Sequence, residues 1–259
     1  THKTSSAASD VYKRQIVGGI GDQSNVDRID YSNDTATAEA KGKLSYSAFY
    51  LGATGNQSYG WVGGGTNTKL STVCRIDYSN DTATATAKGP LSVPNNMVCA
   101  TGNASYGYFG GGETSSPYTL VDRIDYSNDG VTATPKGPLS QARYRAGATG
   151  NTSFGYWGGG ITNPGNLSSI ERIDYSNDTA ITPTVANLLL SPGTYSGGAT
   201  GNVNFGYLGG GNKHPGGSNS AIQRIDYGSD TVTQVSSLAD GTRGFVAATG
   251  NKNFGYWLG

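Results

Sequence analysis

The residues best placed to do chemistry are arginine and aspartate in a four-residue string that recurs along the chain. Arg-Ile-Asp-Tyr begins at Arg28, Arg75, Arg123, Arg172 and Arg224. Arg and Asp stand two residues apart, so they face the same side of an extended strand, where the two charges can pair across neighbouring units. A catalytic acid or base is expected in one unit, whereas these aspartates recur in every one. The string therefore predicts structural ion pairs.

Other reactive side chains are too few for a metal or a nucleophilic site. The chain has two histidines, His2 and His214, and two cysteines, Cys74 and Cys99. These numbers fall short of a copper site and of a Ser-His-Asp triad. Each cysteine replaces other residue types found at the same place in other units, which favours two free thiols over a disulfide. We therefore expect no catalytic residue, no cofactor and no metal.

The charge balance argues against several classes of partner. Lys+Arg and Asp+Glu are both 18 in 259 residues, and charged residues make up only 14% of the chain. Because phosphate binding depends on clustered Lys and Arg, we expect no nucleic-acid partner. No run of 18 apolar residues occurs, so we expect no membrane span.

The elements that hold these residues repeat with a period of about 50 residues. The unit is clearest from residue 143 onwards, where 143–151 and 154–160 read as short strands and 169–175 alternates as a third strand. A Ser-Asn-Asp turn then leads to a fourth strand rich in Thr, Val and Ala. Four short antiparallel strands at this period indicate a blade of a β-propeller. We call the four strands a, b, c and d in chain order.

The order of residues within the unit resembles the kelch repeat. In the third copy Arg143, Gly158-Gly159, Glu171 and Tyr175 occupy the matching places, although the Trp usual after strand c is absent. The resemblance covers almost all of residues 16–259. It implies an all-β fold, a propeller of about five four-stranded blades, with an incomplete piece of a larger propeller as the alternative.

The two ends of the chain differ from the repeats between them. Residues 10–15 resemble a translated sequencing adapter, so we set residues 1–15 aside as an artefactual, disordered leader. Residues 16–259 form a single repeat domain whose units start near 16, 45, 95, 141, 193 and 243. Residues 16–21 read as a leading strand b, and 244–259 as a final a and b. Those final strands could pair with the first c and d to close a five-blade ring, but the leading b would then have no place.

Variable loops identify one rim of the propeller as the candidate binding surface. The a–b turn is Ala-Thr-Gly-Asn in every copy, whereas the b–c and d–a segments differ between copies. Variable loops on a rigid scaffold are where recognition usually takes place, although the loops could also vary because nothing constrains them. The candidate rim residues are Lys69, Tyr118, Arg143, Tyr144, Arg145, Tyr195, His214 and Arg243.

These features favour a non-enzymatic structural or recognition module that binds a protein or a glycan. Low charge with abundant Thr, Ser, Asn and Gly is similar to phage tail fibres and bacterial surface adhesins. We therefore favour an extracellular or virion-associated location, as part of a longer parent chain. Two alternatives stay open. One is the propeller of a glycan-active or oxidative enzyme whose catalytic residues lie outside these residues. The other is a kelch adaptor that binds a peptide.

Overall fold

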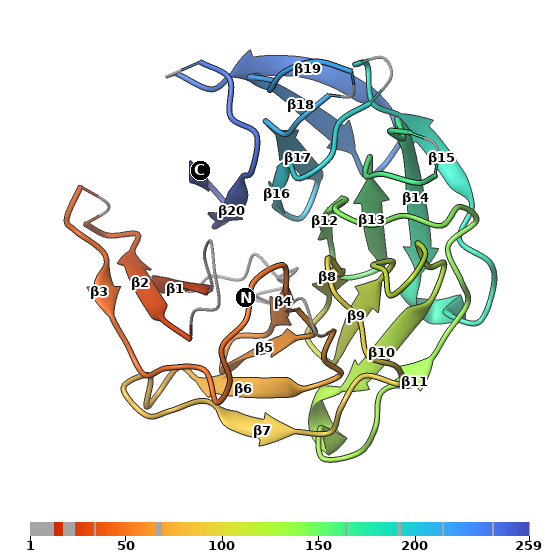
Figure 1. Cartoon of the computed structure of the whole chain (residues 1–259). Helices are drawn as coiled ribbons and strands as arrows, with labels where there is room; N and C mark the ends of the chain where they lie inside the picture. Colours follow the sequence, from red (N-terminus) through yellow and green to blue (C-terminus); the bar gives the residue numbers. More distant parts are fainter. Residues whose placement is uncertain are drawn as a thin grey trace.

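Short antiparallel strands dominate the computed structural model, which describes residues 13–17, 24–33, 35–65, 69–163, 165–190, 193–213, 215–239 and 241–258. The strands form six sheets arranged around a ring (Figure 1). The predicted all-β propeller is therefore confirmed. Within the described residues no helix has the length and hydropathy of a membrane span.

We number the sheets I to VI along the chain, and each position in a sheet has its own set of strands. The innermost strands, a, are β4 (Gly52–Gly55), β8 (Cys99–Gly102), β12 (Gly147–Gly150), β16 (Gly198–Gly201) and β20 (Ala247–Gly250). The second strands, b, are β1 (Lys13–Val17), β5 (Tyr59–Gly63), β9 (Tyr106–Gly110), β13 (Phe154–Gly158), β17 (Phe205–Gly209) and β21 (Gly255–Leu258). The third strands, c, are β2 (Val26–Asp30), β6 (Val73–Asp77), β10 (Val121–Asp125), β14 (Ser169–Asp174) and β18 (Ala221–Asp226). The outer strands, d, are β3 (Glu39–Ala40), β7 (Thr86–Lys88), β11 (Thr134–Pro135), β15 (Thr184–Asn187) and β19 (Val232–Ser237). Two single turns of 3-10 helix follow β10 and β14: η1 (Tyr126–Asn128) and η2 (Tyr175–Asn177).

The number of complete blades is smaller than predicted. Sheets II to V have four strands each, while sheet I has three (β1-β2-β3) and sheet VI has two (β20-β21). The predicted pairing of the final strands with the first c and d does not form, because β1 already occupies that edge of β2, with Val17 opposite Val26. Strand β1 also begins at Lys13, earlier than the predicted residue 16 and inside the segment that was set aside.

Sheets VI and I meet by stacking instead of by strand pairing. The rings of Tyr31 and Tyr256 stack with their centroids 5.4 Å apart, and the hydroxyls of Tyr31 and Thr249 form a hydrogen bond of 2.7 Å. The same contacts join the complete sheets: Trp61 of sheet II stacks on Tyr126 of sheet III at 3.8 Å. The ring is therefore closed by six sheets, of which two are partial.

Hydrophobic side chains between successive sheets form the core. Trp61 of sheet II packs with Phe109 and Ile124 of sheet III, all three almost fully buried. Tyr108 and Ile173 do the same for sheets III and IV, in a second cluster. Period-2 alternation explains this arrangement, since the Ile residues of four Arg-Ile-Asp-Tyr strings pack against the preceding sheet: Ile76, Ile124, Ile173 and Ile225.

Arginines of the recurring string pair across sheets, as predicted, but with a different aspartate. Arg75 contacts Asp129 at 2.9 Å and Arg123 contacts Asp178 at 2.7 Å; these aspartates end the Ser-Asn-Asp turn of the next sheet. The aspartate of the string itself, such as Asp125, accepts hydrogen bonds from Ser127 in its own turn. The two-residue spacing therefore identified the right arginine and the wrong partner.

Glycine pairs end the second strands because the backbone there requires positive φ. Gly111 and Gly112 have φ of 70° and 94°. A Cβ on Gly111 would lie 2.4 Å from the carbonyl oxygen of Arg143. The close approach of two loops thus explains why these runs are structural.

Candidate binding surface at the channel mouth

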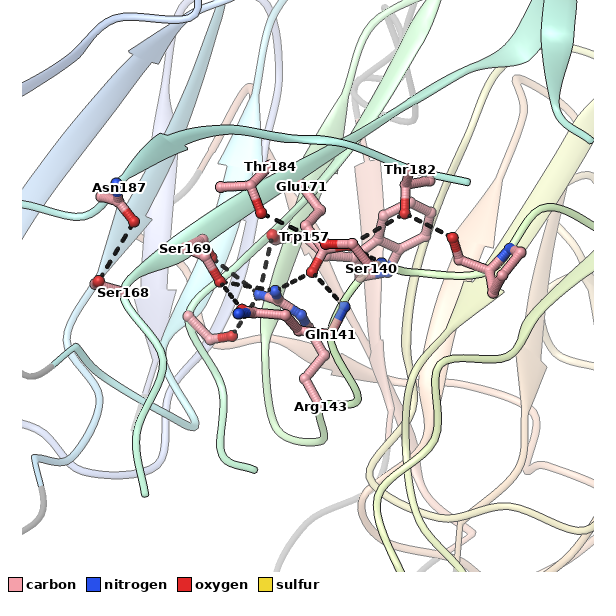
Figure 2. A network of polar contacts seen from close by, with 12 residues as sticks. Ser140, Gln141, Arg143, Trp157, Ser168, Ser169, Glu171, Thr182, Thr184 and Asn187 are labelled. Carbon is pink, nitrogen blue, oxygen red and sulfur yellow. Dashed lines mark hydrogen bonds and ion pairs between the residues drawn. The ribbon is translucent and has the colours of Figure 1, made fainter. Parts of the chain in front are cut away.

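Arg143, one of the predicted rim residues, lies inside the blade and is fully buried. Figure 2 shows its guanidinium directed at Glu171, with which it forms an ion pair. Its Nη1 also donates to the carbonyl oxygens of Gly159 and Ser169, each at 2.9 Å. Arg143 therefore cannot meet a ligand at the rim, and it is removed from the candidate surface.

Glu171 gathers the rest of this network and is also fully buried. Its carboxylate accepts the backbone N–H groups of Ser140 at 2.5 Å and Gln141 at 3.1 Å. The Thr182 hydroxyl adds a third donor at 3.1 Å (Figure 2). The ion pair thus fastens the d–a segment of sheet IV to β14. Among the four-stranded sheets II to V the pair occurs in sheet IV alone, since Ala48, Asn95 and Thr194 stand at the place of Arg143.

Four residues with left-handed backbone stand at the same place before successive inner strands. Tyr50, Met97, Arg145 and Ser196 have φ of 58°, 54°, 57° and 55°. Positive φ is unfavourable for residues other than glycine and is found where the surrounding structure enforces it. Each residue lies two positions before an inner strand begins, and the inner strands line the central cavity.

Backbone hydrogen bonds join these residues into a partial ring. The N–H of Met97 donates to the carbonyl of Tyr50 at 2.8 Å, and that of Arg145 donates to Met97 at 3.1 Å. Ser196 donates to Arg145 at 2.8 Å, and Val246 donates to Ser196 at 3.0 Å. We call Tyr50, Met97, Arg145, Ser196 and Val246 the collar. It spans sheets II to VI and explains why positive φ persists there.

The Arg145 side chain lies among aromatic rings on the collar. Its Cζ is 4.9 Å from the ring centroid of Tyr50, 5.6 Å from that of Phe245 and 5.9 Å from that of Tyr144. Its Nε donates to Met97 Sδ at 3.1 Å. Among the described residues no ion pair is made by Arg145, and its side chain is half-buried. The guanidinium is therefore held in place by rings while its charge is uncompensated.

The wall of the channel offers no comparable chemistry. A cavity of about 320 Å³ is lined mainly by Gly, Ala and Thr of the inner strands, with no carboxylate, Lys or Arg among the described lining residues. Its threonines bind tyrosine hydroxyls of the next sheet, as Thr149 binds Tyr227 at 2.7 Å. No group of His, Cys, Asp and Glu in the described part of the chain could hold a metal ion. The wall thus lacks the charged side chain that stands at the mouth.

The remaining predicted rim residues are spread over separate loops. Tyr144 joins the Arg145 cluster, and burial raises the pKa of its hydroxyl. Tyr118 binds the Thr114 hydroxyl at 2.5 Å. Tyr195 and Arg243 form backbone bridges to the b–c loops, and Lys69 is half-buried with φ of 56°. His214 lies outside the described residues.

Sequence reasoning missed two of the rings around Arg145. Tyr50 and Phe245 stand three residues before the Ala of the Ala-Thr-Gly-Asn turn, as Arg145 does. Aligning the copies on that turn places Tyr, Met, Arg, Ser and Phe in one column. The variation of this column between otherwise similar units was the signal that could have identified the two rings.

Comparison with known proteins reveals a likeness of fold only. No protein-family model and no curated protein matches the sequence. A solved structure described as "Structure of YjhT" superposes with a TM-score of 0.74, covering 95% of this chain and 86% of that chain at 11% sequence identity. The two proteins share a fold. At this identity the likeness says nothing about a shared ligand or activity.

Proposed function

We propose that this protein is a non-enzymatic recognition module that binds its ligand at the collar. In this proposal Arg145 meets a negatively charged group of a protein or glycan, and Tyr50, Tyr144 and Phe245 pack against the neighbouring part of that ligand. A guanidinium fits a carboxylate or sulfate in a two-pronged geometry, and aromatic rings supply apolar contact area at a low entropic cost.

The single observation that supports the proposal most strongly is the Arg145 cluster. A half-buried guanidinium with no ion-pair partner in the described residues stands over Tyr50, and Phe245 beside it is 51% exposed. Large exposed aromatic side chains next to an uncompensated charge are typical of binding surfaces. On the opposite rim, beside the repeated Ala-Thr-Gly-Asn turns, Arg75, Arg123 and Arg172 also lie over aromatic rings, but each of them forms an ion pair. Arg224 lies over Phe205 on the same rim and has no ion pair in the described residues, but Phe205 is half-buried.

We further propose that the repeats are kelch-like and that the parent is an extracellular or virion-associated protein such as a tail fibre or surface adhesin. The support is the repeat pattern, the low charge and the content of Thr, Ser, Asn and Gly. Localisation of the natural protein with antibodies raised against the full chain would test this placement. A cytosolic location would contradict it.

Screening on arrays of acidic and neutral glycans and peptides tests the binding proposal. We expect the full chain to retain ligands that carry a carboxylate or sulfate, and Arg145→Gln to weaken their binding at least about tenfold. The matched control is Lys252→Gln, which removes an exposed positive charge from the a–b turn on the opposite rim. Equal loss in both variants, or retention of neutral ligands only, would contradict a specific role of Arg145.

A further inference from the structure

A second column of variable residues lies beside the collar. It consists of the first residue after the glycines that end the second strands of sheets III to V. Each of these residues forms one backbone bridge to the residue that precedes a collar member and another to its own b–c loop. The bridges are Glu113 with Asn96 and Pro117, Ile161 with Tyr144 and Asn166, and Asn212 with Tyr195 and Ser218. The bridges fix the backbone at each position, while the side chain differs from sheet to sheet.

Glu113 brings a carboxylate to the mouth. Its N–H donates to the carbonyl of Asn96 at 3.0 Å, and the N–H of Gly112 donates to the carbonyl of Arg143 at 2.8 Å. Glu113 therefore lies between the d–a segments that lead into β8 and β12. It is half-buried, and its carboxylate forms no ion pair or hydrogen bond among the described residues. The mouth thus holds a carboxylate and the guanidinium of Arg145, which do not pair with each other.

Tyr144 lies within reach of both charges. The Arg145 Cζ is 5.9 Å from the centroid of the Tyr144 ring. Burial raises the pKa of the Tyr144 hydroxyl most strongly, the negative charge of Glu113 raises it further, and the positive charge of Arg145 lowers it. Because both charges act on one hydroxyl, they lie close to the same ring. The site is therefore dipolar, with an aromatic side chain next to its two charges.

A dipolar site discriminates between classes of ligand. A carboxylate repels an anion, so Glu113 opposes the binding of a chain whose charges are all negative. Acidic glycans are commonly chains of this kind, with carboxylates or sulfates and no cationic group. A polypeptide can present a Lys or Arg and an Asp or Glu a few residues apart. It can thereby satisfy both charges of the mouth at once.

We propose that the collar selects a polypeptide segment that carries a basic and an acidic side chain, an inference that rests on the binding function proposed above for Arg145. The basic side chain meets Glu113, and the acidic side chain meets Arg145 in charge-assisted hydrogen bonds. Apolar atoms between the two charges pack on Tyr144, Tyr50 and Phe245. The ligand is thereby narrowed from a protein or glycan to a protein.

An array of peptides and glycans tests this selection. The peptides consist of Gly and Ser, except for a Lys and a Glu that flank one or more Leu residues. Parallel sets replace either the Lys or the Glu by Gln, and sulfated disaccharides are printed beside them. We expect the full chain to retain the peptides with both charges more strongly than the peptides with Glu alone or the sulfated disaccharides.

Glu113→Gln is the decisive variant, because it removes the carboxylate and leaves the backbone bridges in place. We expect it to weaken the retention of peptides with both charges at least about tenfold, and to leave peptides with Glu alone unchanged or better retained. Arg145→Gln is expected to weaken both sets. The matched control is Asp27→Asn, which removes an exposed carboxylate from the third strand of sheet I and should alter neither set. Circular dichroism verifies that each variant is folded.

Failure of this inference is distinguishable from failure of the proposed function. Suppose that ligands with negative charge alone are retained as strongly as peptides with both charges, and that Glu113→Gln weakens neither. Selection for a basic group would then be overturned, while the role of Arg145 would stand. If Arg145→Gln weakens no set, or if the wild type retains no charged ligand, the proposed function and this inference are both overturned.

Discussion

The guanidinium of Arg123 in sheet III lies 2.7 Å from the carboxylate of Asp178 in the turn that follows β14. The same carboxylate accepts a hydrogen bond from the Tyr108 hydroxyl at 2.9 Å and contacts the Lys136 ammonium at 3.2 Å. Three donors from one sheet thus converge on a single carboxylate of the next. This convergence secures sheet against sheet in a chain that has few charges.

Asp178→Asn is expected to destabilise the protein by about 1–3 kcal/mol, because a buried charge-assisted network loses its anion. The measurement is the free energy of unfolding in urea. Asp230→Asn is the graded comparison: Asp230 is more exposed, at 19% against 8% for Asp178. We expect a smaller loss there. An equal or larger loss for Asp230→Asn would contradict the role given to burial.

Replacing one member of the Arg143–Glu171 pair is expected to lower the free energy of unfolding more than replacing both. Arg143→Met leaves a fully buried carboxylate without its cation, at a cost of about 3–5 kcal/mol. The double variant Arg143→Met with Glu171→Met is expected to recover a large part of that loss, since no buried charge remains. Urea unfolding of the two single variants and the double variant closes a thermodynamic cycle. Strictly additive losses would show that the two side chains act independently.

Stability is expected to fall in acid partly through the turn aspartates. Hydrogen bonds from the Ser127 hydroxyl and N–H lower the pKa of Asp125. A lowered pKa contributes stability above the unfolded value of about 3.9, and this contribution is lost as the pH falls through the folded pKa. Asp125→Ala should therefore lose less stability than the wild type between pH 5 and the acid range, measured as the thermal midpoint.

Asp122 provides a control of opposite sign for this pH dependence. Burial raises its pKa, so its contribution is present at low pH and declines as the pH rises through the folded pKa. The stability of the Asp122→Asn variant relative to the wild type should therefore be higher at neutral pH than in acid. The same trend with pH in the Asp122 and Asp125 variants would contradict these assignments.

Both cysteine thiols are expected to be unreactive in the folded protein. Burial raises the pKa of Cys74 to about 11 and that of Cys99 to about 12, and neither forms a disulfide. The thiolate is the reactive form, so little of it exists at pH 8. A disulfide-exchange reagent should modify both residues quickly in guanidinium chloride and slowly without it. Rapid modification of the folded chain would contradict this expectation.

Sequence periodicity was sufficient to predict the strands and the stacking of sheets. Alternation places Ile124 and Ile173 in the core, and both are buried as that pattern requires. The number of complete blades was not predictable in the same way. The number depends on which strand pairs with the free edge of β2. Strand β1 does so, and its competitor β21 is chemically similar.

Residues on the candidate surface were harder to predict than the fold. Arg143 and Arg145 are two apart near the same loop, yet Arg143 turns inward to Glu171 and Arg145 outward to Tyr50. The difference arises from the left-handed backbone at Arg145, which single-sequence patterns do not reveal for a residue other than glycine. Partners distant in sequence, such as Glu171, decide which arginine is buried.

The collar gives the loops at the channel mouth a shared mechanical response. Because the N–H of each member after Tyr50 donates to the carbonyl of the preceding one, Arg145 is bonded on both sides, as a donor to Met97 and as an acceptor from Ser196. A ligand that stiffens one loop thereby restrains its neighbours around the opening. Five loops with different sequences are thus joined by one run of main-chain hydrogen bonds around the mouth.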